Sequence, residues 1–187
     1  MPNVRKVIVD LQTLDTALYT AVAHTHSPEL DVALRRLSAA ADHSKISLTI
    51  AGLLALHPGR TRHAALLGSA AVALASATAN LAGKRLVHRP RPDRDAAHVI
   101  PGRQVPMPKS ASYPSGHTAS AVAFAAAVGT ALPVAAIPLG VLAGAVGYSR
   151  VHTGVHYPGD VAAGALLGVA SATIVNAVVG IYREPAA

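Results

Sequence analysis

Long apolar stretches alternate with short polar segments along most of this chain. Residues 64–83, 118–149 and 161–182 contain no Asp, Glu, Lys or Arg. A helix of about 20 apolar residues is long enough to cross a bilayer. The middle stretch exceeds one span, and Pro133 near its centre predicts a turn between two helices. This pattern predicts four membrane-spanning helices.

A fifth and weaker span is predicted around residues 46–57. It is long enough only if the helix begins near Ala39 and includes Asp42, His43 and Lys45. Polar side chains of this kind are costly in lipid unless they face a cavity or an interface. The expected fold class is therefore all-α, a transmembrane helical bundle with about five spans. The alternative, a buried bundle in a soluble protein, needs more amphipathic surface than these stretches offer.

Residues 1–43 are predicted to form amphipathic helices. Leucines recur at helical spacing from Leu11 to Leu18 and again from Leu30 to Leu37, with charged residues opposite each stripe. Two aspartates and the lack of a cleavage site argue against a signal peptide. Such helices lie at the membrane interface or pack on the bundle, and both positions stay open. Since the chain shows no linker or repeat, residues 1–187 are expected to form one membrane-embedded domain.

Small residues are frequent in the apolar stretches. Gly140-x3-Gly144 and Gly164-x3-Gly168 have the spacing that lets helices approach closely in lipid. Packing within the bundle is the preferred interpretation, and a homo-oligomer formed through these glycines is the alternative. Asn80 lies in an apolar stretch and is expected to form a hydrogen bond between helices.

Composition narrows the possible functions. Only 3% of the 187 residues are aromatic, which disfavours a nucleic-acid binder that stacks on bases. The absence of cysteine excludes a thiolate zinc site and a cysteine nucleophile. The net charge of +7 favours anionic partners. By itself this charge leaves three kinds of partner open: nucleic acid, anionic lipid or a phosphorylated substrate.

Three polar clusters lie at the ends of the apolar stretches. They are Lys84-x6-Arg91-Pro92, Pro114-Ser115-Gly116-His117 and Ser149-Arg150-x5-His156-x3-Asp160. The span before the first cluster ends there, the connection stays on that side, and the next span begins at the second cluster. The chain then crosses twice and returns at the third. All three clusters, within residues 84–160, are therefore predicted to reach one face of the membrane.

The cations of these clusters suit a phosphate group. Lys84, Arg91 and Arg150 can surround a phosphoryl group, and an arginine can bind it through two hydrogen bonds. Ser115 and Gly116 stand at a predicted helix start, where backbone amides and the helix dipole attract an anion. Taken singly, basic residues beside spans are ordinary topology signals. Four other basic residues of the connection are expected in a solvated loop, or to attract an anionic substrate: Arg89, Arg94, Arg103 and Lys109.

The two histidines supply the candidate chemistry. His117 and His156 titrate near neutral pH, so that one suits a nucleophile and the other an acid. Asp160 follows His156 by four residues and is expected on the same side of the last helix, where it can orient the imidazole. This set requires no metal and no other cofactor.

The three clusters resemble the signature of the type 2 phosphatidic acid phosphatase superfamily, with every signature position filled. The resemblance implies a helical bundle and metal-independent hydrolysis of phosphate esters. It implies that His156 attacks phosphorus to form a phosphohistidine, that Asp160 supports His156, and that His117 protonates the leaving oxygen. It also implies a set of residues that hold the phosphoryl group: Lys84, Arg91, Ser115, Gly116 and Arg150.

The apolar spans favour the membrane lipid phosphatases of this superfamily over its soluble acid phosphatases and haloperoxidases. Residues 41–45 and 148–160 look like the phosphatase half of actinobacterial fusions with a diacylglycerol-kinase-like domain. A second similar group is the actinobacterial decaprenylphosphoryl-phosphoribose phosphatases. The resemblance thus implies a phosphate monoester or pyrophosphate of an amphiphilic lipid, such as phosphatidic acid, phosphatidylglycerol phosphate or a polyprenyl diphosphate. A protein that binds or transports anionic lipid without hydrolysis is the alternative of another class.

The same layout predicts where the protein and its remaining polar residues lie. His43 and Lys45 are expected on the catalytic face, as headgroup contacts or as markers of the interface. The protein is expected to be a multi-pass protein of the cell membrane. The resemblance favours a catalytic face outside the cytoplasm, whereas the charge distribution does not decide the orientation, because several basic residues of that face serve the chemistry.

Overall fold

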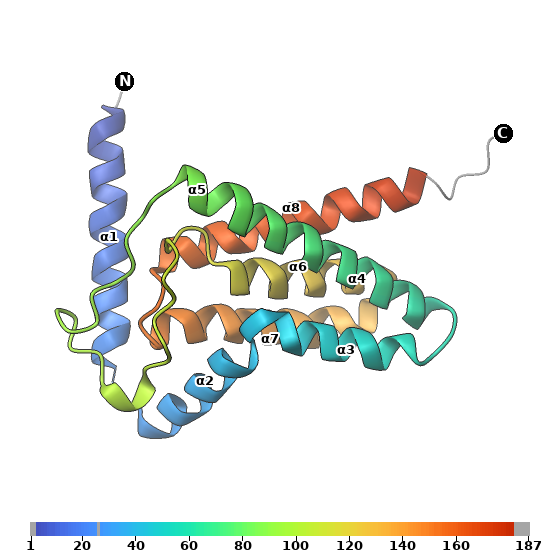
Figure 1. The fold of residues 1–187 in the computed structure, drawn as a ribbon, viewed down its shortest axis with the longest axis horizontal. Coiled ribbons are helices and arrows are strands. Elements are labelled where there is room, and N and C mark those ends of the chain that lie inside the picture. The colour runs from blue at the N-terminus through green and yellow to red at the C-terminus, as the bar shows by residue number, and fades with distance from the viewer. Residues whose placement is uncertain (1–2, 26, 182–187) are drawn as a thin grey trace.

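The computed structural model describes residues 3–25 and 27–181 as a chain of helices (Figure 1). In chain order they are α1 (Val4–His24), α2 (Pro28–Ala40), α3 (Lys45–Ala55), α4 (Arg60–Ala77), α5 (Lys84–Leu86), α6 (Gly116–Ala131), α7 (Pro133–His152) and α8 (Pro158–Ile181). A 3₁₀ turn, η1 (Asp42–Ser44), joins α2 to α3, and a π-helical turn over Thr78–Gly83 carries α4 into α5. The predicted all-α class is confirmed.

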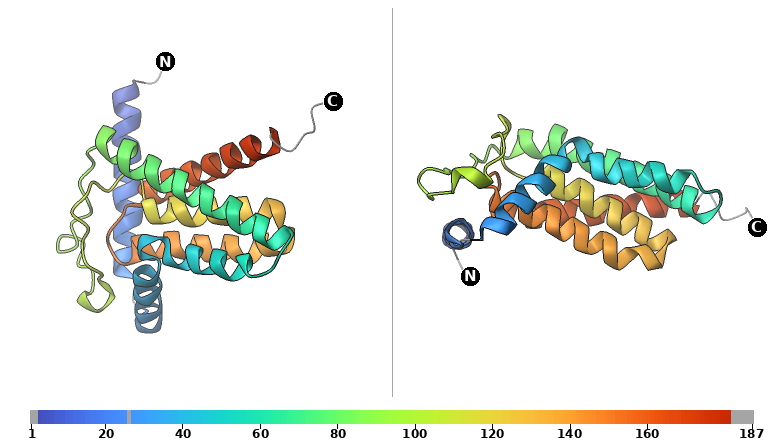
Figure 2. Two further views of the ribbon diagram at one scale, coloured as in Figure 1. Left: turned by 45° about the vertical axis from the view of Figure 1, so that its right-hand side comes forward. Right: turned by 90° about the horizontal axis from the view of Figure 1, so that it is seen from below.

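Helix α6 is the central element of a bundle that it forms with α3, α4, α7 and α8 (Figures 1 and 2). Phe124 and Val128 of α6 pack on buried side chains of α3 and α4. Small buried side chains fill the contacts of α6 with α4 and α8: Leu67, Ala71, Ala75, Ala119, Ala123, Ala127 and Ala172. Because these side chains are small, the helix axes approach closely.

The two glycine pairs behave differently. A Cβ atom on Gly164 would lie 2.5 Å from the Ser115 carbonyl oxygen, and one on Gly168 would lie 2.6 Å from that of Ala119. This pair therefore packs α8 directly against the backbone of α6, as predicted. Around Gly140 and Gly144 no described atom lies within 4 Å of such a Cβ, so that pair does not pack within the bundle.

Three of the described helices are long and apolar enough to cross a membrane: Arg60–Leu86, Pro133–His152 and Pro158–Gly180. The predicted turn at Pro133 is confirmed, because α6 ends at Ala131 and α7 begins at Pro133. Helix α6 has 16 residues and α3 has 11, which is short of the length used to predict about five spans. Helix α3 cannot extend back to Ala39, because His43 and Ser44 adopt left-handed backbone conformations (φ 56° and 58°).

Helices α1 and α2 lie at the end of the bundle where α6 and α8 begin (Figures 1 and 2). The C-terminal half of α1 packs on the bundle through Tyr19 and Ala23, which are buried with Val151 of α7. Its N-terminal half leaves Leu11 and Leu14 exposed. Helices are present in both predicted places, and the C-terminal half of α1 takes one of the two expected positions, packed on the bundle.

Segment 87–115 crosses this end of the bundle as an extended connection. Arg103 is fully buried there, and its guanidinium donates hydrogen bonds to the carbonyl oxygens of Ala23 and Thr25 at the end of α1. Arg94 donates to the carbonyl oxygens of Thr153 and Gly154. The expectation of a solvated loop is therefore wrong for Arg94 and Arg103, because their guanidinium groups donate hydrogen bonds to backbone carbonyls at helix ends. Lys109 is exposed as expected.

Candidate active site

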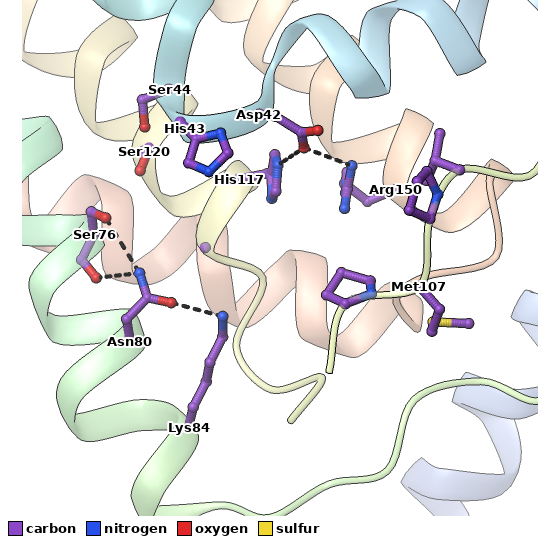
Figure 3. A pocket seen from close by; sticks show the side chains of 14 residues that line it. Asp42, His43, Ser44, Ser76, Asn80, Lys84, Met107, His117, Ser120 and Arg150 are labelled. Atoms are coloured by element: carbon purple, nitrogen blue, oxygen red, sulfur yellow. Dashed lines mark hydrogen bonds and ion pairs between the residues drawn. The ribbon is translucent and has the colours of Figure 1, made fainter. Parts of the chain in front are cut away.

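A cavity of about 420 Å³ opens where α6 begins and α7 ends (Figure 3). Its wall combines side chains from η1, the α4–α5 helix, α6, α7 and segment 105–108. Five of the predicted site residues line it: His43, Lys84, Gly116, His117 and Arg150. The crossing argument from the sequence is thereby supported, because residues of all three clusters meet at this end of the bundle.

Lys84 enters the cavity from the last turn of the α4–α5 helix. Its Nζ donates to Oδ1 of Asn80 at 2.7 Å, and Nδ2 of Asn80 donates to the Ser76 carbonyl oxygen at 2.9 Å. The interhelical bond predicted for Asn80 is therefore wrong, since both partners belong to its own helix. Asn80 instead holds the ammonium group of Lys84 over the cavity (Figure 3).

Arg91 and His156 lie in direct contact. Nη1 of Arg91 is 3.3 Å from Nε2 of His156 and donates to the Val155 carbonyl oxygen at 2.7 Å. Nε of Arg91 donates to the carbonyl oxygen of Ser110 at 2.8 Å. These backbone bonds fix the guanidinium beside the Nε2 edge of the imidazole. An anion at that edge would meet a fixed cation.

His156 is buried between α7 and α8 and is held on both its backbone and its ring. Its amide donates to the Arg150 carbonyl oxygen at 3.2 Å, and its Nδ1 lies 3.4 Å from Oδ2 of Asp160. Burial lowers the pKa of His156 from 6.5 to about 4, and the charges of Arg91 and Arg150 act in the same direction. The ring is therefore neutral at pH 7, with Asp160 on Nδ1 and Nε2 directed toward Arg91.

Asp160 is fully buried and accepts hydrogen bonds on both carboxylate oxygens. The Tyr157 amide donates to Oδ2 at 2.9 Å, and Nη1 of Arg89 donates to Oδ1 at 2.9 Å. Nη2 of Arg89 binds Oδ2 of Asp15 on α1 at 2.6 Å. Arg89, which the sequence placed in a solvated loop, thus bridges a carboxylate of α1 and the carboxylate that contacts His156.

A second histidine–aspartate pair joins Asp42 of η1 to His117 of α6. Nε2 of His117 lies 2.7 Å from Oδ1 of Asp42. The same oxygen is 3.9 Å from Nη1 of Arg150, which donates to Oγ of Ser38 at 2.6 Å. Nε of Arg150 is buried without a hydrogen-bond partner among the described residues, which is uncommon for a buried donor.

Ser115 and Gly116 form the start of α6, as predicted. Oγ of Ser115 caps the helix through the Thr118 amide, and the Ser115 amide donates to the Asp160 carbonyl oxygen at 2.9 Å. The Ser115 amide is therefore occupied by a backbone acceptor. The amides of Gly116 and His117 occupy the first helical turn, where no intrahelical acceptor exists. Gly116 lines the cavity, whereas Ser115 is fully buried behind it.

The two candidate headgroup contacts, His43 and Lys45, lie in different places. His43 lines the cavity next to Ser44 and Ser120, whereas Lys45 is exposed and is not part of its wall. Sequence reasoning did not assign roles to Asp42, Arg89 or Asp15. Asp42 lies in segment 41–45, which carries part of the resemblance. That resemblance could have pointed to Asp42 as a site residue. Asp15 and Arg89 are 74 residues apart in the sequence, and nothing in the sequence pattern pointed to their contact.

Comparisons with known proteins agree with this arrangement. Residues 64–183 match the PAP2 superfamily. The chain is 38% identical over 157 residues to decaprenylphosphoryl-5-phosphoribose phosphatase of Mycobacterium tuberculosis, and the alignment covers 82% of each protein. The fold resembles the transmembrane PAP2-type phosphatidylglycerolphosphate phosphatase of Bacillus subtilis, with a TM-score of 0.69, 22% identity and coverage of 94% of this chain and 89% of that one. Aquifex aeolicus LpxE gives the same TM-score at 26% identity, covering 88% of this chain and 95% of that one.

The bundle, its apolar helices and the polar site at one end define a class of protein, the membrane phosphatases that act on lipid phosphates. Within this class, the chain belongs to the PAP2 superfamily, as both the matched residues and the mycobacterial relative indicate.

Proposed function

We propose that this protein hydrolyses the phosphate monoester or pyrophosphate of an amphiphilic lipid through a phosphohistidine. Nε2 of His156 attacks phosphorus, the bond from phosphorus to the lipid oxygen breaks, and His117 donates a proton to that oxygen. Water then attacks the phosphohistidine, the P–N bond breaks, and inorganic phosphate leaves. The contact of Arg91 with Nε2 of His156, on the edge opposite Asp160, is the observation that carries this proposal.

The proposed phosphate site combines Lys84 and Arg150 in the wall of the cavity with Arg91, which lies beside His156 outside that wall. Lys84, Arg91 and Arg150 neutralise the phosphoryl oxygens, and the unpartnered Nε of Arg150 offers a hydrogen bond. The first-turn amides of α6, at Gly116 and His117, add donors at the positive end of the helix dipole. We place Ser115 in this set as the cap that fixes those amides. This charge stabilisation is what phosphoryl transfer chiefly requires.

Asp42 has a proposed role beside His117. Its carboxylate lies 2.7 Å from Nε2 of His117 and orients the imidazole for proton transfer to the leaving oxygen. None of these steps requires a metal ion, and we propose that the reaction is metal-independent.

The proposed setting is a single domain, residues 1–187, with α4, α6, α7 and α8 crossing the cell membrane. We place the catalytic end outside the cytoplasm, and we expect the substrate to be presented from the bilayer. Phosphatidic acid, phosphatidylglycerol phosphate and polyprenyl diphosphates all fit this description.

A polyprenyl-phosphoribose phosphate is a second, more specific candidate substrate. The mycobacterial relative is named for this type of activity, and it aligns over most of both chains. In this protein the cavity extends from His117 along polar side chains that suit a hydroxyl-bearing leaving group: His43, Ser44, Ser76, Asn80 and Ser120.

Phosphate release from a panel of these lipids, with EDTA present, tests the proposal. We expect release by the purified wild-type protein and none above background by His156→Ala, whose fold is checked by its melting temperature. A matched variant, His88→Ala, removes an exposed histidine of the connection and should keep full activity. Activity of His156→Ala at the wild-type rate would refute the assigned nucleophile, and activity lost in EDTA would refute metal independence.

A further inference from the structure

The N-terminal half of α1 carries an uncovered apolar face. Ile8, Leu11, Leu14 and Leu18 are between 48% and 60% exposed. With Ala162 and neighbouring residues of the first turns of α8, they line a groove of about 490 Å³. The opposite face of α1 carries the exposed residues Val9, Thr13 and Thr16, so it is more polar than the leucine face.

The orientation of α1 matches a membrane surface. It runs nearly perpendicular to the helices of the bundle, in all three views (Figures 1 and 2). Since those helices cross the bilayer, α1 lies parallel to the membrane plane. The groove includes the start of α8, and the exposed apolar side chains Leu166 and Val169 continue this surface along that helix. The apolar face of α1 is thus continuous with the lipid-facing surface of α8.

Asp15 connects this face to the active site. It lies in the same groove, where Oδ1 accepts from the Gly159 amide at 2.6 Å and Oδ2 binds Nη2 of Arg89 at 2.6 Å. Nη1 of Arg89 binds Asp160 at 2.9 Å, and its guanidinium stacks 4.1 Å above the centre of the Tyr157 ring. Two carboxylates on one planar guanidinium hold each other in a defined geometry.

We propose that α1 docks on the bilayer surface beside α8, and that Asp15 and Arg89 transmit its position to the Asp160 carboxylate. The second half of this inference rests on the proposed phosphatase function. Asp15 and Arg89 are positioning residues, because they act on the reaction only through Asp160 and His156. Displacement of α1 from the membrane removes one carboxylate from Arg89 and leaves Asp160 less firmly held.

Docking is tested by site-specific labelling, which the cysteine-free sequence makes simple. Leu11→Cys and, as its matched control on the opposite face, Thr13→Cys are labelled with an environment-sensitive fluorophore in full-length protein. Both are placed in vesicles that contain nitroxide-bearing lipids. We expect lipid quenching at position 11 and little at position 13. Equal quenching at the two positions overturns docking. Docking is also overturned if position 11 is shielded but lipid does not quench it, and that result would indicate that a second protein chain covers this face.

Coupling is tested by comparing Asp15→Asn with Asp10→Asn, which changes an exposed aspartate of the same helix. In bilayers we expect Asp15→Asn to lower kcat about tenfold with KM changed less than about twofold, the size of effect typical of groups that orient a reacting residue. Asp15→Glu keeps the charge and should restore most of kcat. Equal kcat values for the two asparagine variants overturn the coupling. No phosphate release by the wild type counts against the proposed function, because lipid quenching does not depend on turnover.

Discussion

The two histidine–aspartate pairs of the site are built in different ways. His156 and Asp160 are four residues apart, with His156 two residues before α8 and Asp160 in its first turn, and their side chains are 2% and 0% exposed. His117 and Asp42 are 75 residues apart, come from α6 and η1, and have side chains that are 22% and 46% exposed. The carboxylate contacts Nδ1 of His156 but Nε2 of His117.

This difference suits two different tasks. A nucleophile needs a neutral ring with a fixed direction of attack, and burial with a carboxylate on the far nitrogen gives both. An acid needs a proton and access to the leaving oxygen, and the second pair lies in the wall of the cavity with its carboxylate open to water. In the proposed mechanism the buried pair would therefore meet the phosphate, and the exposed pair would meet the leaving group.

The largest expected contrast comes from removing the two carboxylate charges in turn. Asp160→Asn should lower kcat by about 10³ to 10⁴, the size of effect seen when a buried aspartate no longer orients a catalytic histidine. Asp42→Asn should lower it only about tenfold, because a half-exposed ion pair is screened by solvent. Steady-state phosphate release from one lipid substrate measures both. Similar losses in the two variants would remove the distinction drawn between the pairs.

His117→Asn separates the two tasks by leaving group. With a lipid alkyl phosphate we expect a loss of about 10² to 10⁴, the usual contribution of a general acid. With a nitrophenyl phosphate the leaving group departs as a stable anion, so the loss should fall below about tenfold. The ratio of the two rates, measured for wild type and variant, is the readout. An equal loss with both substrates would assign His117 to phosphate binding instead of proton donation.

The pH dependence gives the smallest and most specific effect. Because the pKa of His156 is lowered from 6.5 to about 4, its ring should stay able to attack well below pH 6.5. The acidic limb of kcat/KM, corrected for titration of the substrate, should then lie nearer pH 4 than 6.5. The unfolded chain binds this proton at higher pH than the folded one, so the melting temperature should also fall as pH drops from 6.5 toward 4. A limb at pH 6.5 would show that His156 is more solvated than its burial indicates.

The sequence predicted the parts of the molecule that depend on local spacing. His156 and Asp160 were paired from their separation by one helical turn, and the turn at Pro133 followed from its fixed backbone geometry. Counting crossings of the membrane was enough to bring Lys84 and Arg150 to one end of the bundle.

The remaining features depend on contacts between segments distant in sequence. The Asp15–Arg89 pair joins residues 74 apart, and Arg103 is buried by carbonyl groups 78 to 81 residues before it. Hydropathy alone treats such arginines as solvated. The length of α3 was overestimated because the left-handed conformations of His43 and Ser44 have no glycine to mark them.

The close packing of Gly164 against the Ser115 carbonyl has a consequence for how this enzyme can diversify. Together with the bond from the Ser115 amide to the Asp160 carbonyl oxygen, it joins the starts of α6 and α8 into one rigid block. That block includes Ser115, which caps α6, and Asp160, which contacts His156. A side chain at position 164 would therefore disturb both residues. The opposite wall includes His43, Ser44 and residues 105–108, which make none of these contacts. We expect changes of substrate to arise by mutation there more readily than in the block that joins α6 and α8.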